Sequence, residues 1–201
     1  MVSRPSSTEL SPSAVSTKIV IAGGFGAGKT TFVRSISEIE PVTTEALMTE
    51  ASRDSDDLSA TPDKVTTTVA MDFGRVSLDQ DLALYLFGTP GQDRFWFLWD
   101  DLIRGALGAV VLADPRRLAD CFPAIEYFEN QPEAPFIVAL NCFDGILPFD
   151  LDDVRSALAI GPEVPLLTCD ARDTGSAVYT LVELVRYAMS FAGPMAMEAS
   201  R

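Results

Sequence analysis

Continuous apolar runs mark the strands that this sequence predicts. The runs lie at residues 18–22, 106–113 and 136–140, and a shorter one spans residues 164–168. Strands of a parallel sheet that is covered on both faces carry such unbroken hydrophobic runs, whereas a strand with one face in water alternates. We therefore expect these four segments to form buried parallel strands.

Helical patterns separate the apolar runs. They span residues 31–39, 118–130, 151–159 and 176–191. In the first of them Phe32, Ile36 and Ile39 recur at helical spacing, and Pro41 marks its end. Strands and helices therefore alternate along most of the chain.

Two further segments predict an antiparallel hairpin. Residues 66–77 and 82–87 have the composition of strands, and the turn-rich residues 78–81 join them. The whole pattern predicts an α/β fold, a three-layer sandwich in which helices cover both faces of a mainly parallel sheet with one antiparallel hairpin strand. Ligands of such sheets bind at the carboxyl ends of the strands.

Length and composition predict one domain. The chain has 201 residues, 47% of them hydrophobic, and no apolar run approaches the length of a membrane span, so we expect a soluble domain of residues 17–192. Residues 1–16 are rich in Ser, Thr and Pro and lack the apolar stretch of a secretory signal, which favours a flexible arm. We expect residues 44–65 to form a mobile acidic loop and residues 193–201 a loose tail.

The distribution of charge, histidine and cysteine excludes several functions. Histidine is absent, which removes Ser-His catalysis and His-liganded zinc sites. Cys121, Cys142 and Cys169 lie far apart without metal-ligand spacing, as expected of reduced thiols in the cytoplasm. The net charge of −14 disfavours nucleic acid and anionic membranes as direct partners and favours a basic partner surface.

One segment carries the chemistry of a phosphate site. Residues 23–30 fit the pattern G-x-x-x-x-G-K-[ST] and directly follow the strand at 18–22. Glycines let backbone N–H groups turn toward a polyphosphate, Lys29 is expected to reach the β- and γ-phosphates, and the Thr30 hydroxyl to ligate Mg²⁺. We therefore predict binding of a nucleoside triphosphate. The residues expected to contact it here are Gly24, Gly26, Ala27, Gly28, Lys29, Thr30 and Thr31.

Three later segments follow the phosphate loop in a fixed order. Residues 89–92 (TPGQ) come after the second hairpin strand, residues 141–144 (NCFD) after the strand at 136–140, and residues 168–172 (TCDAR) near the end. Together with the phosphate loop they resemble, in order and spacing, the motifs of Ras-type small GTPases. The resemblance covers residues 17–191 and implies a Ras-like P-loop NTPase fold that binds GTP and GDP.

The resemblance implies catalytic and metal-binding roles. In the family the glycine at the position of Gly91 senses the γ-phosphate and the glutamine at the position of Gln92 orients the attacking water, with Lys29 beside them. Thr68 corresponds to the switch threonine that ligates Mg²⁺ together with Thr30. The neighbouring Thr66 and Thr67 leave that register open.

The resemblance also implies how the base is recognised. Asn141 and Asp144 keep the spacing of the guanine-binding motif, in which the aspartate accepts both guanine N1–H and N2–H. The amide of Ala171 would approach guanine O6, and Arg172 would cover the ring. The lysine that usually packs over the base is replaced by Cys142, so the preference for guanine over adenine stays open.

Two other positions depart from the family pattern. The aspartate that usually holds the metal's water shell is Gly88, and Asp72 is one candidate to replace it. Asp114, which closes the run at 106–113, is the position that a P-loop ATPase would use, but in a Ras-like order it ends a strand away from the metal. Phe25 stands where the family usually has glycine and crowds Gln92, which predicts slow intrinsic hydrolysis.

The missing aspartate and the altered NCFD segment resemble one branch in particular, the small GTPases encoded in actinobacterial conservons and related to the bacterial gliding-motility GTPases. That resemblance implies a GDP/GTP switch in a signalling complex. Its implied partners are a roadblock-fold protein and a sensor-kinase-like membrane protein from the same operon. It also implies a cytoplasmic chain that reaches the membrane only through a partner and does not insert into it.

Two alternatives remain open at this level. The first is a nucleotide-binding pseudo-GTPase scaffold without meaningful hydrolysis, which Phe25, Gly88 and Cys142 together favour. The second is an ATP-using P-loop enzyme. Phosphate release separates the first from a working GTPase, and competition between GTP and ATP tests the second.

Overall fold

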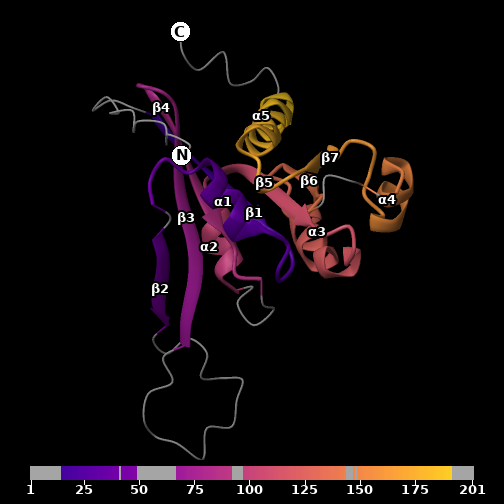
Figure 1. Cartoon of the computed structure of the whole chain (residues 1–201), viewed down its shortest axis with the longest axis horizontal. Helices are drawn as coiled ribbons and strands as arrows, with labels where there is room; N and C mark the ends of the chain where they lie inside the picture. Colours follow the sequence, from indigo (N-terminus) through magenta and orange to yellow (C-terminus); the bar gives the residue numbers. More distant parts are fainter. Residues whose placement is uncertain are drawn as a thin grey trace, which may run out of the picture.

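Figure 1 shows the computed structural model of the chain, in which helices lie on both sides of a sheet. The structure describes residues 15–40, 42–48, 67–91, 97–143, 147 and 149–191, with no side-chain description at residues 42–48, 67–70 and 79.

Within these residues, seven strands form one sheet. The strands are β1 (Val15–Ala22), β2 (Val42–Met48), β3 (Thr67–Asp79), β4 (Leu82–Gly88), β5 (Ala106–Ala113), β6 (Phe136–Asn141) and β7 (Leu166–Cys169). Their order across the sheet is β2-β3-β4-β1-β5-β6-β7. Strand β3 is antiparallel to both neighbours, and the pairs from β4 to β7 are parallel.

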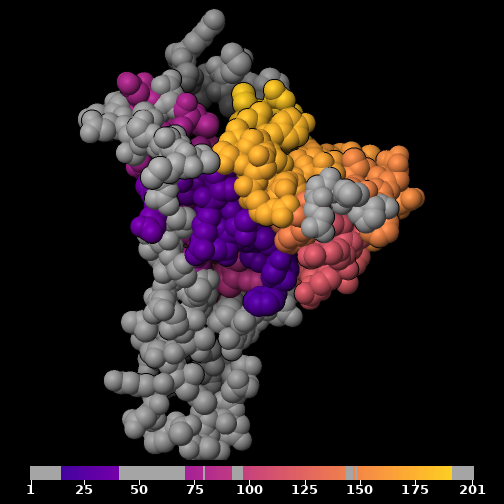
Figure 2. All heavy atoms as spheres, viewed as in Figure 1, coloured from indigo at the N-terminus to yellow at the C-terminus, as the bar shows by residue number. Residues whose placement is uncertain are grey.

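Helices cover both faces of the sheet and make it a three-layer sandwich. The helical elements are α1 (Lys29–Ile36), α2 (Trp99–Ile103), the 3₁₀ turn η2 (Leu118–Cys121), α3 (Phe122–Glu129), α4 (Leu151–Leu158) and α5 (Thr174–Phe191). Phe32 of α1 and Leu184 of α5 share one buried cluster, and Figure 2 shows these two helices side by side. Trp99 of α2, Phe128 of α3 and Leu158 of α4 belong to the cluster on the other face.

The alternation along β1 explains why this strand lies at the centre. Ile19 and Ile21 pack into the cluster under α1 and α5, whereas Val20 and Ala22 pack into the cluster on the opposite face. A strand that is apolar on both sides buries both only between two helical layers. Because β1 is paired with β4 and β5, its carboxyl end opens between the ends of those two strands.

The predicted fold class is confirmed, and most predicted elements lie within a few residues of their expected bounds. The β3–β4 hairpin turns at residues 80–81, as expected from the sequence. Helix α1 is shorter than predicted, because the backbone becomes extended at Ser37. Ile39 therefore lies beyond the helix. The run at 118–130 divides into η2 and α3 at Phe122.

The expected loop at residues 44–65 is wrong for its first part. Strand β2 occupies residues 42–48 and pairs with β3 from Val42 opposite Phe73 to Met48 opposite Thr67. An isolated segment with weak periodicity gives little strand signal, but an adjacent edge of β3 supplies backbone partners for it. Residues 49–65 lie outside the described residues.

The expected domain ends also shift slightly. Residues 15 and 16, assigned to the flexible arm, begin β1, where Val15 is opposite Leu82 of β4. Residues 1–14 and 192–201 lie outside the described part of the chain. The three cysteines are free and buried. Among the described helices, none has the length and apolarity required to span a bilayer.

Candidate functional site

The loop between β1 and α1 has the conformation that a phosphate cradle requires. Gly28 has φ of +103°, and a Cβ added there would lie 2.3 Å from the Asn141 Nδ2 atom. Gly23 has φ of +133°, and its added Cβ would lie 2.2 Å from the Leu112 carbonyl oxygen. Neither the backbone conformation nor the space admits a side chain, so glycine is required at both positions.

Lys29 is buried inside this loop with its ammonium group against the loop's own carbonyls. Its Nζ atom donates hydrogen bonds to the carbonyl oxygens of Gly23 at 2.8 Å and Gly24 at 2.7 Å, and only 8% of the residue is exposed. Burial lowers the pKa of Lys29 to about 8, and the nearby Asp72 carboxylate opposes that shift. A buried cation in a loop of this shape is placed to contact an anion.

A carboxylate on β3 lies beside the first turn of α1. The Thr30 hydroxyl donates a hydrogen bond of 2.5 Å to the Asp72 Oδ2 atom. Asp72 is directly opposite Gly88 of β4, and a Cβ added to Gly88 would lie 3.1 Å from the Asp72 Cβ and 3.3 Å from its Oδ2. The Asp72 carboxylate thus occupies the space next to the position where the sequence pattern lacks an aspartate.

Asn141, at the end of β6, connects two of the sequence motifs. Its Nδ2 atom donates to the carbonyl oxygen of Ala27 at 2.9 Å, and its Oδ1 atom accepts from the amide of Ala171 at 3.1 Å. The residue is only 2% exposed. These bonds place the phosphate loop and the loop after β7 on either side of one buried amide. They also mean that the Ala171 amide, expected to face guanine O6, is directed at Asn141.

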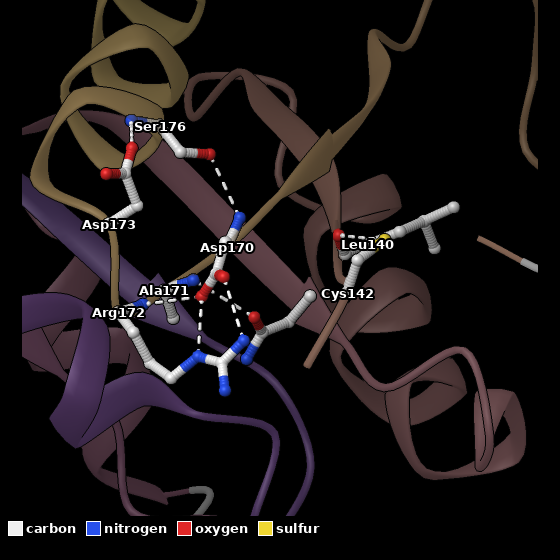
Figure 3. Close-up of polar contacts among 8 residues, drawn as sticks. Leu140, Cys142, Asp170, Ala171, Arg172, Asp173 and Ser176 are labelled. Atoms are coloured by element: carbon white, nitrogen blue, oxygen red, sulfur yellow. Dashed lines mark hydrogen bonds and ion pairs between the residues drawn. The ribbon is translucent and has the colours of Figure 1, made fainter. Parts of the chain in front are cut away.

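Arg172 forms a two-pronged ion pair with Asp170, as Figure 3 shows. Its Nε atom donates to Oδ1 and its Nη2 atom to Oδ2, both at 2.9 Å, and its backbone amide also donates to Oδ1. The Arg172 guanidinium keeps the pKa of Asp170 below its usual range. The planar, exposed guanidinium is therefore fixed at the carboxyl end of β7.

The same arrangement occurs at the end of β5. Arg116 donates to Asp114 from Nε at 2.9 Å, from Nη2 at 2.8 Å and from its backbone amide at 2.9 Å. The Arg116 guanidinium lies 4.2 Å from the ring centroid of Phe143, just beyond β6. Asp114 ends its strand and binds a neighbouring arginine, as expected for a residue outside the metal site. The same D-x-R spacing recurs in Asp170 and Arg172, and it is a signal from which both pairs could have been predicted.

Cys142 presents a short, buried thiol at the position where the Ras-type pattern has a lysine. It is buried, its Sγ atom lies 3.5 Å from the Leu140 carbonyl oxygen, and Figure 3 shows it apart from the pair of Asp170 and Arg172. Burial raises the pKa of the Cys142 thiol. Neither a charge nor a long side chain reaches from this position toward a base.

Gly91 lies against the phosphate loop. A Cβ added to it would be 2.8 Å from the Lys29 Nζ atom and 3.0 Å from the Phe25 Cα atom. The side chain of Phe25 is 70% exposed, so it projects from the loop instead of filling it. The structure thus brings together the segment containing Gly91, the lysine and the unusual phenylalanine of the loop.

The remaining predicted residues are placed only in part. Thr31 is exposed in the first turn of α1, and Gly26 has positive φ with open space around it. Thr68 lies on β3, where the structure describes its backbone but not its side chain. Gln92 and Asp144 lie outside the described residues.

Solved structures support the fold. The chain is similar to the G domain of the T. maritima FeoB iron transporter, with 15% identity, a TM-score of 0.56, and coverage of 89% of this chain and 99% of that one. It is also similar to the cytosolic domain of the T. maritima FeoB iron transporter in its apo form, with 15% identity, a TM-score of 0.59, and coverage of 87% and 64% respectively. At this identity the similarity shows the fold alone. No curated protein sequence matches the chain.

A family model described as a conserved hypothetical ATP-binding protein matches residues 21–191. The matched region begins in the last residues of β1, ends with α5 and contains every motif discussed above. The chain therefore belongs to this family of conserved hypothetical ATP-binding proteins, and it is a nucleotide-binding P-loop domain with a GTPase-like fold.

Proposed function

We propose that this chain is a guanine-nucleotide switch that binds GTP and GDP and hydrolyses GTP slowly. The observation that carries the proposal is the pair of hydrogen bonds of Asn141, which joins the phosphate loop at Ala27 to the loop at Ala171. A site built this way couples phosphate binding to the loops that surround a base. The spacing of Asn141 and Asp144 favours guanine, because one carboxylate accepts two N–H groups that adenine does not offer.

ATP is the second candidate ligand. The family description names ATP, and the Ala171 amide that would select guanine O6 is bonded to Asn141. For guanine to be read here, its O6 atom must share or displace that bond. The pairing of Arg172 with Asp170 supports the proposal that its guanidinium covers a purine ring of either kind.

Magnesium fits the residues beside Lys29. Hydroxyl and carboxylate oxygens are the donors that Mg²⁺ prefers, and Thr30 and Asp72 present one of each in direct contact. When bound there, Mg²⁺ would neutralise charge on the β- and γ-phosphates. We assign Thr30 and Asp72 to its binding, with Thr68 as a third ligand from the same strand as Asp72.

The protein's own residues would support hydrolysis through position and charge. Lys29 has three N–H donors and would turn at least one of them from its loop carbonyls in order to reach both a β- and a γ-phosphate oxygen. Gly91 lies near enough for its segment to respond to a γ-phosphate. Gln92 would orient the attacking water. The backbone of Phe25 lies against Gly91 and its ring is exposed at the surface of the loop, where it would restrict approach by an arginine from a partner. We therefore propose slow hydrolysis in the isolated protein.

The switch function rests on the segments that the γ-phosphate would hold. Loss of that phosphate would release Thr68 and residues 91–92, and so change the surface offered to a partner. The net charge of −14 favours a basic partner surface. By resemblance, we propose a roadblock-fold protein and a sensor-kinase-like membrane protein as those partners, with the chain in the cytoplasm and recruited to the membrane only through them.

The test is a calorimetric titration of the purified chain with GTP, GDP and ATP, each with and without Mg²⁺. We expect GTP and GDP to bind at least about tenfold more tightly than ATP, a difference of about 1.4 kcal/mol. Asp144→Asn should shift the preference toward xanthosine triphosphate, whose C2 carbonyl accepts from an amide. Preference for ATP in the unchanged protein would overturn the guanine assignment in favour of an ATP-binding protein.

A second measurement separates a switch from a scaffold. Single-turnover release of phosphate from bound GTP should be slow but measurable, and Gln92→Ala should lower it further. Tight GTP binding with no phosphate release over many hours would show a pseudo-GTPase instead.

A further inference from the structure

Arg117 is paired with Asp120, a residue that packs against the phosphate loop, and neither takes part in the site described so far. A Cβ added to Gly24 would lie 2.6 Å from the carbonyl oxygen and 2.7 Å from the Cβ atom of Asp120, so η2 is in direct contact with the loop. The Asp120 Oδ2 atom accepts from the Nη2 atom of Arg117 at 2.5 Å. Asp120 therefore contacts Gly24 through its backbone carbonyl and Cβ and pairs with Arg117 through its carboxylate.

Asp120 also lines a small cavity next to the loop. The cavity has a volume of about 20 Å³ and is lined by Gly23, Gly24, Gly91, Trp99, Asp120, Pro123 and Ala124. That volume is sufficient for one water molecule. Gly23 and Gly24 are the residues whose carbonyls hold the Lys29 ammonium, and Gly91 lies beside it. The cavity thus connects Asp120 with the end of the loop where the γ-phosphate would lie.

The positions of the charges suggest why Arg117 is paired here. The negative charge of Asp120, a residue packed against a loop that binds a polyanion, would oppose that binding, and in the described structure Arg117 pairs with it. The pair is partly exposed, with 60% of the Arg117 side chain and 34% of the Asp120 side chain accessible, so the guanidinium is able to move. A phosphate oxygen with more negative charge than the carboxylate would compete for it.

We propose that Arg117 is a catalytic arginine supplied by the chain itself, and that its ion pair with Asp120 restrains it in the described structure. This rests on the proposed function, since it requires a γ-phosphate at Lys29. In hydrolysis, a water oxygen bonds to the γ-phosphorus as the bond to the β–γ bridging oxygen breaks. The diphosphate leaves with that electron pair, and the water proton leaves with the phosphate product or to solvent. Arg117 transfers no proton and supplies only positive charge to the γ-phosphate oxygens.

The test compares Arg117→Ala and Asp120→Asn in the full chain with Arg186→Ala as control. Arg186 pairs with Glu183 on α5 in the same i,i+3 spacing, and its side chain is 69% exposed, so it matches Arg117 away from the loop. We expect Arg117→Ala to slow single-turnover hydrolysis about tenfold or more, since an arginine on the γ-phosphate contributes about 10³ to 10⁵ in related enzymes. GDP affinity should change less than about threefold.

Asp120→Asn distinguishes a catalytic arginine from a structural ion pair. If Asp120 restrains Arg117, this substitution releases it and speeds hydrolysis several-fold, and the double variant hydrolyses at the rate of Arg117→Ala alone. If the pair only stabilises η2, both single variants slow hydrolysis alike, which overturns the proposal.

A binding readout completes the test. Aluminium fluoride with GDP mimics the transferring phosphoryl group, so the unchanged protein and Arg186→Ala should retain GDP longer when it is added, and Arg117→Ala should not. Equal retention by all three would overturn the assignment of Arg117. Failure of the unchanged protein to bind GDP at all would instead refute the proposed function.

Discussion

The Thr30 hydroxyl donates a 2.5 Å hydrogen bond to the Asp72 carboxylate, which joins the first turn of α1 to β3. Asp72 is directly opposite Gly88, the position on β4 where the Ras-type pattern has an aspartate. A carboxylate from β3 therefore stands beside the phosphate loop in place of one from β4.

Removal of this carboxylate should weaken magnesium-dependent nucleotide binding. We expect Asp72→Asn to reduce the affinity for GTP with Mg²⁺ about tenfold or more and to change the affinity measured with EDTA much less, since the charged acceptor is lost. Titrations of both states provide the measurement. Asp153→Asn, at an exposed aspartate of α4, is the matched control and should leave both affinities unchanged.

A swap of the two residues tests the relocation directly. The variant Asp72→Gly with Gly88→Asp returns the carboxylate to β4 and removes the Asp72 atoms that a side chain at Gly88 would otherwise crowd. We expect it to bind magnesium nucleotide better than Asp72→Gly alone. Equal, low affinity of both variants would argue that the position on β3 is essential or that no metal binds here.

Loss of the Asn141 side chain should lower both stability and nucleotide affinity. Asn141→Ala leaves the Ala27 carbonyl and the Ala171 amide without their buried partner. Each unsatisfied buried group costs about 1 to 3 kcal/mol, so for the two groups we expect a loss of about 2 to 6 kcal/mol in the free energy of unfolding. Urea denaturation measures it. Asn130→Ala, which removes one exposed bond to Glu126, should cost less than about 1 kcal/mol.

Glycine substitutions in the phosphate loop should separate backbone strain from steric conflict. Gly26 and Gly105 both have positive φ with no atom near an added Cβ, so Gly26→Ala and Gly105→Ala should each cost about 1 to 2 kcal/mol of stability. Gly28→Ala adds the conflict with Asn141 and should cost more than either. Of the first two, only Gly26→Ala should also weaken nucleotide binding. Equal losses for Gly28 and Gly105 would show that Asn141 moves aside at little cost.

The sequence predicted the sheet because its central strands are apolar on both faces. The runs at 106–113 and 136–140 coincide with β5 and, within one residue, with β6. It did not predict β2, whose residues 42–48 pair with β3 by backbone bonds that carry no side-chain periodicity. The pattern of apolar residues along a segment indicates which positions are buried. An edge strand such as β2 depends instead on backbone pairing with the neighbouring strand.

The candidate site likewise contains features that the sequence predicts and features that depend on the fold. The phosphate loop was predictable because glycine and lysine at fixed spacing are required by its geometry. The bond between Asn141 and Ala27 and the contact between Asp120 and Gly24 join residues far apart in the chain, and only the strand order brings them together. Asp72 was one candidate among the acidic residues, and its register opposite Gly88 distinguishes it.

A smaller side chain at Phe25 should accelerate hydrolysis. The backbone of Phe25 adjoins Gly91 and its ring is 70% exposed, so Phe25→Gly opens the approach to the loop from solvent and removes little buried surface. We expect a rise of several-fold in single-turnover hydrolysis and a change in stability of about 1 kcal/mol or less. Phe191→Ala, at an exposed phenylalanine of α5, should alter neither. A slower Phe25→Gly variant would show that the ring assists the reaction.

The buried thiol of Cys121 should make stability depend on pH in the alkaline range. Burial raises the pKa of Cys121 from 9.0 to about 11, because its thiolate would be cut off from water. Between these two values the unfolded chain releases a proton that the folded chain retains, so the free energy of unfolding falls as pH rises. The slope from one such group reaches about 1.4 kcal/mol per pH unit. Urea denaturation at pH 8, 9, 10 and 11 should therefore show a steeper decline for the unchanged protein than for Cys121→Ala. Parallel curves would mean that the thiol titrates alike in both states, and rapid labelling of native Cys121 by iodoacetamide at pH 8 would independently contradict its burial.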